Sequence, residues 1–176
     1  MVLYHGTYKF IEQINLKRGN KRMDFGQGFY LGDNLQCAKD WAADRFPEKG
    51  VSPTVMVYEV DDVIFTAETL DLLRFDTPSK EWLEFVELNH RRDLPKSEEP
   101  RHSHDMVYGR VANDRAADTI AEFVDGDIPW EEALKQIKTV PDVFQLSLHT
   151  PLSLEYIKAI EFWQLLNNEW QCHKCT

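Results

Sequence analysis

The order of the expected elements favours an α+β fold, and three observations support it. Apolar segments of strand character and amphipathic helical segments follow one another irregularly, not as repeated βαβ units. No strand is followed by the glycine-rich helix turn of doubly wound dinucleotide folds. A chain of 176 residues, 43% of them hydrophobic, is long enough to bury one core. We therefore expect a single domain, 1–176, in which helices flank two small, mainly antiparallel sheets.

Two strands and a helix are expected in the first third of the chain. Residues 2–5 form a strand, and Asn34 can cap a helix that continues to residue 46. Residues 54–60 are rich in β-branched side chains and nearly all apolar, which is typical of a strand. Residues 63–66 extend that strand or pair with it.

The rest of the chain alternates helices and strands after one long polar connection. A helix is expected from Thr77-Pro78, with proline at the first helical position. The later elements are expected at residues 105–108 (strand), 113–124 (helix), 129–138 (helix), 143–148 (strand), 151–159 (helix) and 162–166 (strand). Residues 91–104 are polar and contain two prolines, so we expect a surface loop, and loops of this length are often functional.

The composition limits the classes of partner. The formal net charge is -10, which argues against tight, sequence-independent binding to a phosphate backbone. No segment approaches the roughly 18 apolar residues of a membrane span, and the first residues have no secretory pattern. The chain has three cysteines, an odd number that suggests a reducing compartment. We expect a cytoplasmic protein without a membrane partner.

Two groups of potential metal ligands lack the pattern of a metal site. Cys172 and Cys175 have zinc-like spacing, but a closed structural site needs four ligands and no second pair exists. These cysteines are expected to be free thiols in a frayed tail. His102, His104 and Asp105 follow no regular metal-binding spacing. No metal cofactor is therefore expected.

The first stretch with chemical potential is Tyr4-His5-Gly6-Thr7, at the end of the first expected strand. A histidine there can offer one ring nitrogen to a ribose hydroxyl and the other to a carbonyl. Gly6 allows a ligand to approach the backbone closely, and Thr7 adds a hydroxyl. Considered alone, His5 can instead be a partly buried histidine whose ring nitrogens hydrogen-bond to the backbone.

The second stretch is Gly26-Gln27-Gly28-Phe29-Tyr30. Its two glycines predict a close-packed turn before a short strand, in which Phe29 and Tyr30 point to opposite faces. One ring can enter the core while the other stacks on a flat heterocycle; a hairpin with two core aromatics is the alternative. The basic run at 17–22 can meet a pyrophosphate or be a solvated loop.

Together these stretches resemble the first two elements of the His-Tyr-Glu class of ADP-ribosyltransferases, which includes diphtheria-toxin-like enzymes and poly(ADP-ribose) polymerases. The resemblance implies that the two sheets form a cleft for NAD, the substrate. It implies that His5 contacts the adenosine ribose, that the Gly6 backbone binds the nicotinamide amide, and that Tyr30 stacks on nicotinamide, with Thr7 and Gly28 beside them. Asp24-Phe25 before the glycines resembles an uncharacterised bacterial branch.

The third element of that class is a catalytic glutamate on a late strand, and here the matching position is Gln145. Loss of nicotinamide leaves positive charge on the ribose, which a carboxylate stabilises. A glutamine can hydrogen-bond the 2'-hydroxyl, but it is neutral. Losing one such electrostatic contact costs about 2.7–4 kcal/mol, or a hundred- to thousandfold in rate. Ser147, on the same face, can also line the pocket.

A substitute carboxylate can come from two places. Asp105 follows the polar loop. Asn113, Asp114 and Arg115 lie at the start of an expected helix, where Asn113 is an N-cap and Asp114 suits the helix dipole. In the alternative interpretation, Asp114 or Arg115 faces the cleft and takes part in catalysis or target binding.

The expected function is transfer of a single ADP-ribose from NAD to an unknown acceptor, which is a protein, a nucleic acid or a small molecule. Because Gln145 is uncharged, a non-catalytic NAD or ADP-ribose sensor is an alternative. Hydrolysis of NAD with water as acceptor is another. A third is an interaction module, such as one half of a toxin–antitoxin pair whose activity a regulatory partner masks.

Overall fold

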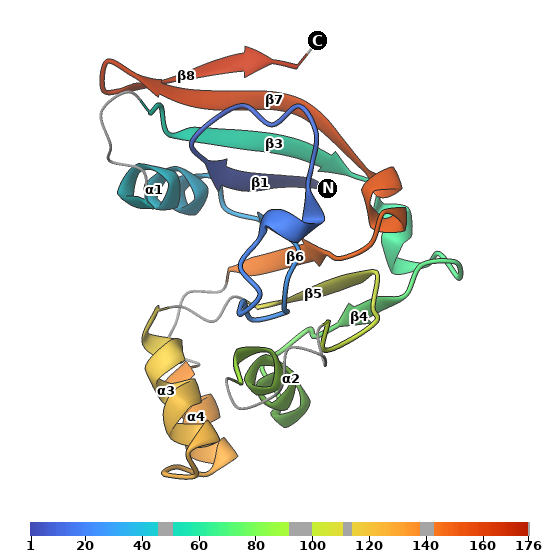
Figure 1. The fold of residues 1–176 in the computed structure, drawn as a ribbon, viewed down its shortest axis with the longest axis vertical. Helices are drawn as coiled ribbons and strands as arrows, with labels where there is room; N and C mark the ends of the chain where they lie inside the picture. The colour runs from blue at the N-terminus through green and yellow to red at the C-terminus, as the bar shows by residue number, and fades with distance from the viewer. Residues whose placement is uncertain (46–50, 92–99, 111–113, 138–142, 176) are drawn as a thin grey trace.

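The computed structural model describes residues 1–45, 51–91, 100–110, 114–137 and 143–175. The described strands are β1 (Val2–Thr7), β2 (Phe29–Gly32), β3 (Thr54–Val60), β4 (Leu72–Arg74), β5 (Met106–Arg110), β6 (Phe144–Leu148), β7 (Ile157–Leu166) and β8 (Glu169–Lys174). The described helices are α1 (Leu35–Arg45), α2 (Lys80–His90), α3 (Asp114–Val124) and α4 (Trp130–Ile137). Figure 1 shows their arrangement.

The eight described strands form one sheet in the order β4-β5-β6-β2-β1-β3-β7-β8. Only the pair β4–β5 is parallel, and the other six pairs are antiparallel. In the middle of the sheet, β1 and β2 are paired at a single register position, Tyr4 opposite Gly32. The next pair outward, β1 with β3, is in register over its full length, from Val2–Glu59 to Thr7–Thr54. The sheet therefore has two four-stranded halves that meet at one narrow junction.

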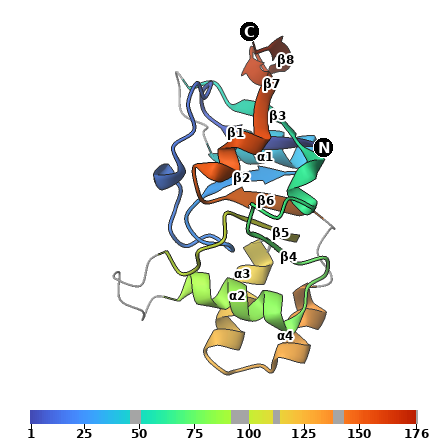
Figure 2. The same ribbon diagram turned by 90° about the vertical axis from the view of Figure 1, so that its right-hand side faces the viewer.

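Two apolar clusters lie on opposite faces of the sheet. Consecutive residues of β5 belong to different clusters, Met106 to one and Val107 to the other, as the alternation of a strand requires. The first cluster contains Leu3 of β1 and Phe29 of β2. The second packs Phe25 and β5 against α2, α3 and α4, which lie together beside the β4–β5 end of the sheet (Figures 1 and 2).

Most of the expected elements are confirmed. The side chain of Asn34 accepts a hydrogen bond from the backbone N–H of Cys37 at 3.0 Å, which is the expected cap for α1. Ser79, rather than Thr77-Pro78, caps α2: its hydroxyl accepts from the backbone N–H of Trp82 at 3.2 Å. Asn113 lies outside the described residues, and α3 begins at Asp114. The mixed α and β content is as predicted.

The expectation of two small sheets is not met, because the single Tyr4–Gly32 pair joins the two halves. The helix expected at 151–159 is wrong. A short 3-10 turn covers Leu152–Tyr156, and residues from Ile157 pair with β3 instead. Residues 63–66, expected as strand, belong to the 3-10 turn Asp62–Phe65 and the residue after it. In the first case the pairing of β7 with β3 outweighs local propensity, and in the second case a local turn does so.

Two strands were not predicted, β4 and β8. Strand β8 follows a two-residue turn, in which Asn167 and Asn168 have φ of 51° and 65°. Asparagine tolerates this left-handed backbone, so the Asn-Asn pair is a readable hairpin signal. Cys172 consequently lies in a strand rather than in a frayed tail. Cys37, Cys172 and Cys175 are free thiols.

Candidate functional site at the junction of β1, β2 and β6

The junction of the two half-sheets brings together the three sequence stretches singled out above. Tyr4 lies opposite Gly32, and Gly32 lies opposite Gln145 of β6. Adjacent strands are about 4.8 Å apart, so Tyr4 and Gln145 lie two strand spacings apart on one face of the sheet. His5, the next residue of β1, lies on the other face, where its ring stacks on Phe29. We call His5, Asp24, Tyr30 and Gln145 the junction site.

The ring of His5 is held against β2. Its Nδ1 lies 2.8 Å from the backbone oxygen of Tyr30, and its ring stacks on Phe29 with centroids 4.2 Å apart. Burial lowers the pKa of His5 to about 4, although the bond to Tyr30 opposes this. The ring is therefore neutral at pH 7. Because a carbonyl oxygen only accepts, Nδ1 carries the proton and Nε2 keeps a lone pair that can accept from a ligand hydroxyl.

Gly6 and Thr7 have packing roles in this structure. A Cβ on Gly6 would lie 2.8 Å from the backbone oxygen of Ala38 and 2.9 Å from the ring of Trp41. The glycine therefore allows α1 to pack against β1, which is a different reason from the close ligand approach expected from sequence. Thr7 is buried and pairs with Thr54 of β3.

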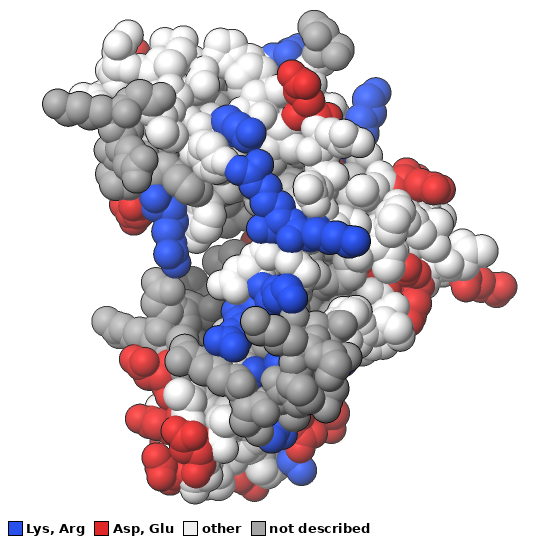
Figure 3. All heavy atoms as spheres, viewed as in Figure 1, with Lys and Arg blue, Asp and Glu red and all other residues white. Residues whose placement is uncertain are grey.

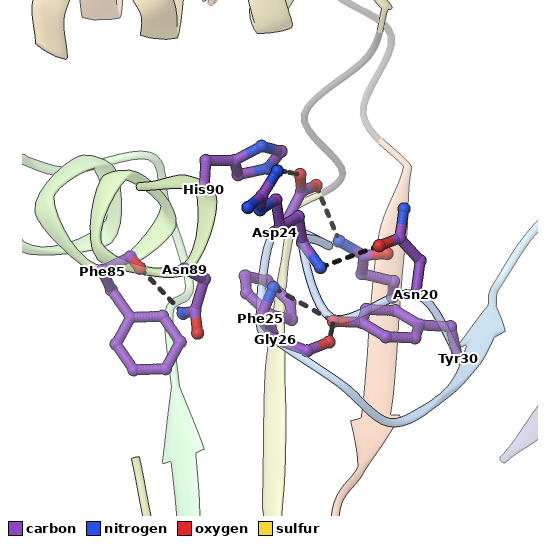
Figure 4. Close-up of polar contacts among 10 residues, drawn as sticks. Asn20, Asp24, Phe25, Gly26, Tyr30, Phe85, Asn89 and His90 are labelled. Atoms are coloured by element: carbon purple, nitrogen blue, oxygen red, sulfur yellow. Dashed lines mark hydrogen bonds and ion pairs between the residues drawn. The ribbon is translucent and has the colours of Figure 1, made fainter. Parts of the chain in front are cut away.

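Tyr30 is fixed by its hydroxyl. The hydroxyl donates to the backbone oxygen of Gly26 at 2.6 Å and accepts from the backbone N–H of Phe25 at 3.1 Å (Figure 4). Burial, and then the charge of Asp24, raise the pKa of Tyr30 well above its ordinary value. Phe29 is buried as expected, and Tyr30 lies on the opposite face of the strand. His5 therefore contacts the backbone of Tyr30 from the Phe29 face of the sheet. The Tyr30 ring lies on the other face, which Gln145 shares.

Gln145 is bonded to a carboxylate that sequence reasoning did not select. Its Nε2 donates to Oδ2 of Asp24 at 3.1 Å, and Oδ1 of Asp24 lies 3.1 Å from Nε2 of His90 (Figure 4). The Asp24 side chain is 13% exposed, and that of Gln145 is buried. The only sequence signal was the position of Asp24 directly before Phe25 and the glycines. A negative charge therefore lies beside the neutral glutamine.

Asp105, one of the carboxylates that the sequence suggested, has a structural role here. Asp105 accepts from the hydroxyl of Thr150 at 2.5 Å and from the backbone N–H of Asp71 at 3.0 Å, so it ties two turns together. Asp114 and Arg115 are in the first turn of α3. α3 packs against α2 and α4, in the second apolar cluster.

Gly28 and Ser147 connect the junction site to its surroundings. A Cβ on Gly28 would lie 2.6 Å from the backbone oxygen of Leu148 and 2.8 Å from Nδ1 of His149, so only glycine fits. Ser147 is fully buried, and its hydroxyl lies 2.8 Å from Nε2 of His149. Nδ1 of His149 lies 2.9 Å from the backbone oxygen of Gln27. Ser147 therefore orients a histidine instead of lining an open surface.

A pocket of about 360 Å³ lies next to the junction site, beside Gly26 and Gln27. Its described lining comes from residues 16–27, the end of α2, residues 100–104 and residues 149–151, and it does not include His5, Tyr30 or Gln145. The positively charged and imidazole side chains of this lining are Lys17, Lys21, Arg101, His102, His104 and His149. We call it the basic pocket.

Three histidines gather at the basic pocket. The rings of His102 and His149 meet edge to face with centroids 4.5 Å apart, and those of His102 and His104 stack at 5.5 Å. His104 is bonded to Asp71 through Nδ1 at 3.0 Å. Within the described residues, no group of three or more histidine, cysteine, aspartate or glutamate side chains is arranged to hold a metal ion. None of the described helices has both the length and the apolar composition needed to cross a membrane.

Comparison with known proteins places the chain in a family. A family model described as "Protein of unknown function (DUF3990)" matches residues 1–159. The chain belongs to this family. No curated protein and no solved structure matches it. The matched range includes the junction site and the basic pocket and ends inside β7.

Proposed function

We propose that the chain binds NAD at the junction site and transfers a single ADP-ribose to an acceptor, with release of nicotinamide. The observation that supports this most is that His5, Tyr30 and Gln145 lie on the adjacent strands β1, β2 and β6 at the junction, with the His5 ring on one face of the sheet and the Tyr30 and Gln145 side chains on the other. These are the positions for which the sequence resembles the His-Tyr-Glu class of ADP-ribosyltransferases. In this proposal the domain has an ADP-ribosyltransferase-like fold.

His5 is proposed to orient the ribose. Its proton is committed to the backbone oxygen of Tyr30, so Nε2 accepts from a ribose hydroxyl. The backbone of Gly6 contacts the nicotinamide amide, and the Tyr30 ring stacks on nicotinamide. Because two hydrogen bonds hold the Tyr30 hydroxyl, the ring is fixed before the ligand arrives, which reduces the ordering cost of binding.

Asp24 is proposed to supply the charge that Gln145 lacks. When the glycosidic C–N bond breaks, nicotinamide leaves with the electron pair and positive charge develops on the ribose ring. The acceptor then bonds to the same carbon and releases a proton. Gln145 hydrogen-bonds the 2'-hydroxyl, while the carboxylate of Asp24, bonded to Gln145, stabilises the charge. Removing one contact of this kind costs about a hundred- to thousandfold in rate.

The test combines calorimetry with NAD and a nicotinamide-release assay on wild type, His5→Ala, Tyr30→Ala and Asp24→Asn. The exposed Asp127→Asn is the matched control. We expect His5→Ala to lose NAD affinity, and Asp24→Asn to keep affinity but lose release by about a hundredfold or more. Turnover that survives both His5→Ala and Tyr30→Ala contradicts the site, and release unaffected by Asp24→Asn contradicts the role of Asp24.

A second candidate function is a non-catalytic NAD sensor. The observation that favours it is that Gln145 is buried and neutral, with its amide already bonded to Asp24. NAD binding in the wild type without any nicotinamide release distinguishes the sensor from the transferase. Release of free ADP-ribose without a labelled acceptor instead indicates NAD hydrolysis.

A further inference from the structure

The carboxylate of Asp24 is bonded at both of its oxygens, by residues of two different elements. Oδ2 accepts from the amide of Gln145 on β6, and Oδ1 faces Nε2 of His90, the last residue of α2, each at 3.1 Å (Figure 4). Because a carboxylate only accepts, Nε2 of His90 carries a proton and donates it in either charge state of the ring. One bond alone leaves the carboxylate free to rotate, whereas these two fix its plane.

The second apolar cluster sets the distance between Asp24 and His90. Phe25, which follows Asp24, is fully buried, and its ring lies against that of Phe85 on α2, with centroids 6.1 Å apart. Val86, one helical turn before His90, is fully buried in the same cluster. Since close-packed interiors hold their side chains in one arrangement, the core fixes the backbone next to both members of the pair.

The end of α2 is also held by hydrogen bonds. The backbone N–H of Arg91 donates to the oxygen of Glu87 at 3.0 Å. The guanidinium of Arg101 donates to the backbone oxygens of Leu88 and Arg91 at 2.8 and 2.9 Å. The last carbonyls of a helix have no partner within the helix, so Arg101 satisfies two of them. The helical turn that carries His90 is therefore fixed from outside the helix.

The charges around Asp24 give a reason for a second fixed partner. The chain has a net charge of -10, yet Figure 3 shows Lys and Arg side chains in a band across the middle of the face seen in Figure 1, where the β1–β2 connection runs. Asp24 belongs to this connection, as does the exposed basic run at 17–22. Long exposed cations attract a carboxylate in many geometries. A histidine at the fixed end of α2 selects the orientation that faces Gln145.

We propose that His90 is a positioning residue for ADP-ribosyl transfer, which holds the Asp24 carboxylate toward Gln145 and the ribose. This inference rests on the proposed function of the junction site. His90 acts through Asp24 and not on NAD itself. A carboxylate turned away from the ribose stabilises its positive charge less, since Coulomb energy falls with distance. That charge develops only in the transition state, so His90 affects the rate of nicotinamide release and not the affinity for NAD.

Two amide variants of His90 form a matched pair. The amide nitrogen of glutamine reaches the position of Nε2, whereas that of asparagine ends near the position of Nδ1. We expect His90→Asn to lower kcat for nicotinamide release by about tenfold with KM unchanged, because a hydrogen bond to a charged group is lost. His90→Gln should restore most of the rate. Equal kcat values for the two variants overturn the proposal.

A double variant tests whether His90 acts through the carboxylate. In the Asp24→Asn background, His90→Asn should cause no further loss of kcat, because the group that it positions has already lost its charge. A further loss of about tenfold, as large as in the wild-type background, overturns the proposal. His90 would then act independently of Asp24.

NMR spectra of the histidine rings separate this inference from the proposed function. The wild type should show a proton on Nε2 of His90, and Asp24→Asn should shift that signal. An unchanged signal overturns the positioning role, whether or not NAD turns over. Nicotinamide release at the wild-type kcat in His90→Asn contradicts the role of His90 alone. No release from the wild type contradicts the proposed function, and this inference with it.

Discussion

The junction site and the basic pocket lie on either side of Gly26–Gly28, and they differ in how their polar groups are satisfied. At the junction site, protein atoms bond Nδ1 of His5, the Tyr30 hydroxyl and the amide nitrogen of Gln145. At the pocket, Asn89 and His102 each have a buried acceptor without a partner in the described structure. The protein itself satisfies these polar groups in the first region, whereas the second region keeps two buried acceptors unsatisfied.

The largest effect is expected on the free energy of unfolding at acidic pH, because each region contains a buried neutral histidine. The pKa of His5 and of His149 is lowered to about 4, from 6.5 in the unfolded chain. Below pH 6.5 the unfolded chain binds protons that the folded chain excludes, so stability is lost as the pH falls from 6.5 to 4. Each histidine contributes about 3 kcal/mol to this loss.

Urea unfolding of wild type, His5→Gln and His149→Gln between pH 7 and 5 measures these contributions. Each variant should show a flatter pH dependence than wild type, whatever its stability at pH 7. If only one variant flattens the profile, that histidine alone is held neutral and the two regions differ in burial. Two unchanged slopes contradict both assignments.

A smaller effect is expected at Gly28, where the two regions touch. Gly28→Ala places a methyl group 2.6 Å from a backbone oxygen of β6 and 2.8 Å from the His149 ring. Neither neighbour is a flexible side-chain end, so we expect a loss of about 1–3 kcal/mol in the free energy of unfolding. Gly32→Ala, at the end of β2, is the control, since its nearest contact is at 3.9 Å. Equal stability of the two variants would show that the turn adapts.

The smallest effect is expected from Gln145→Glu, which introduces the glutamate of the resembling class. The new carboxylate lies beside Asp24, which is 3.1 Å from the present amide, so the pKa of one of the two carboxyls rises. A rise of about one pKa unit destabilises the fold by about 1.4 kcal/mol. The loss is absent below the unfolded value of about 4.3 and grows as the pH rises above it. Denaturation of Gln145→Glu against Gln145→Met at pH 4 and pH 8 measures it, and an equal difference at both pH values would contradict it.

The sequence predicts where helices and strands lie better than it predicts which strands pair. The cap at Asn34 and the strands on either side of the glycines follow from backbone and side-chain preferences. The helix expected at 151–159 failed because pairing with β3 decides the structure from Ile157 onward. That pairing joins segments about a hundred residues apart, so the preferences of neighbouring residues cannot predict it.

The candidate site shows the same division. His5 contacts the backbone of Tyr30, and Gln145 lies on β6, the neighbour of β2; their roles toward NAD stay predictions. Asp24, His90 and Asn89 were not selected, because their meeting depends on how α2 packs against the β1–β2 connection. His149 directly follows the strand that carries Gln145 and Ser147, so alternation along that strand could have indicated it.

The single Tyr4–Gly32 pair at the middle of the sheet has a thermal consequence. Backbone hydrogen bonds contribute little to holding the half-sheets together at this place. The first apolar cluster spans the junction instead, with Leu3 and Tyr58 from one half and Phe29 and Leu146 from the other. Hydrophobic contacts weaken on cooling. We therefore expect β1 and β2 to separate more readily in the cold, while each half-sheet keeps its own ladder of hydrogen bonds.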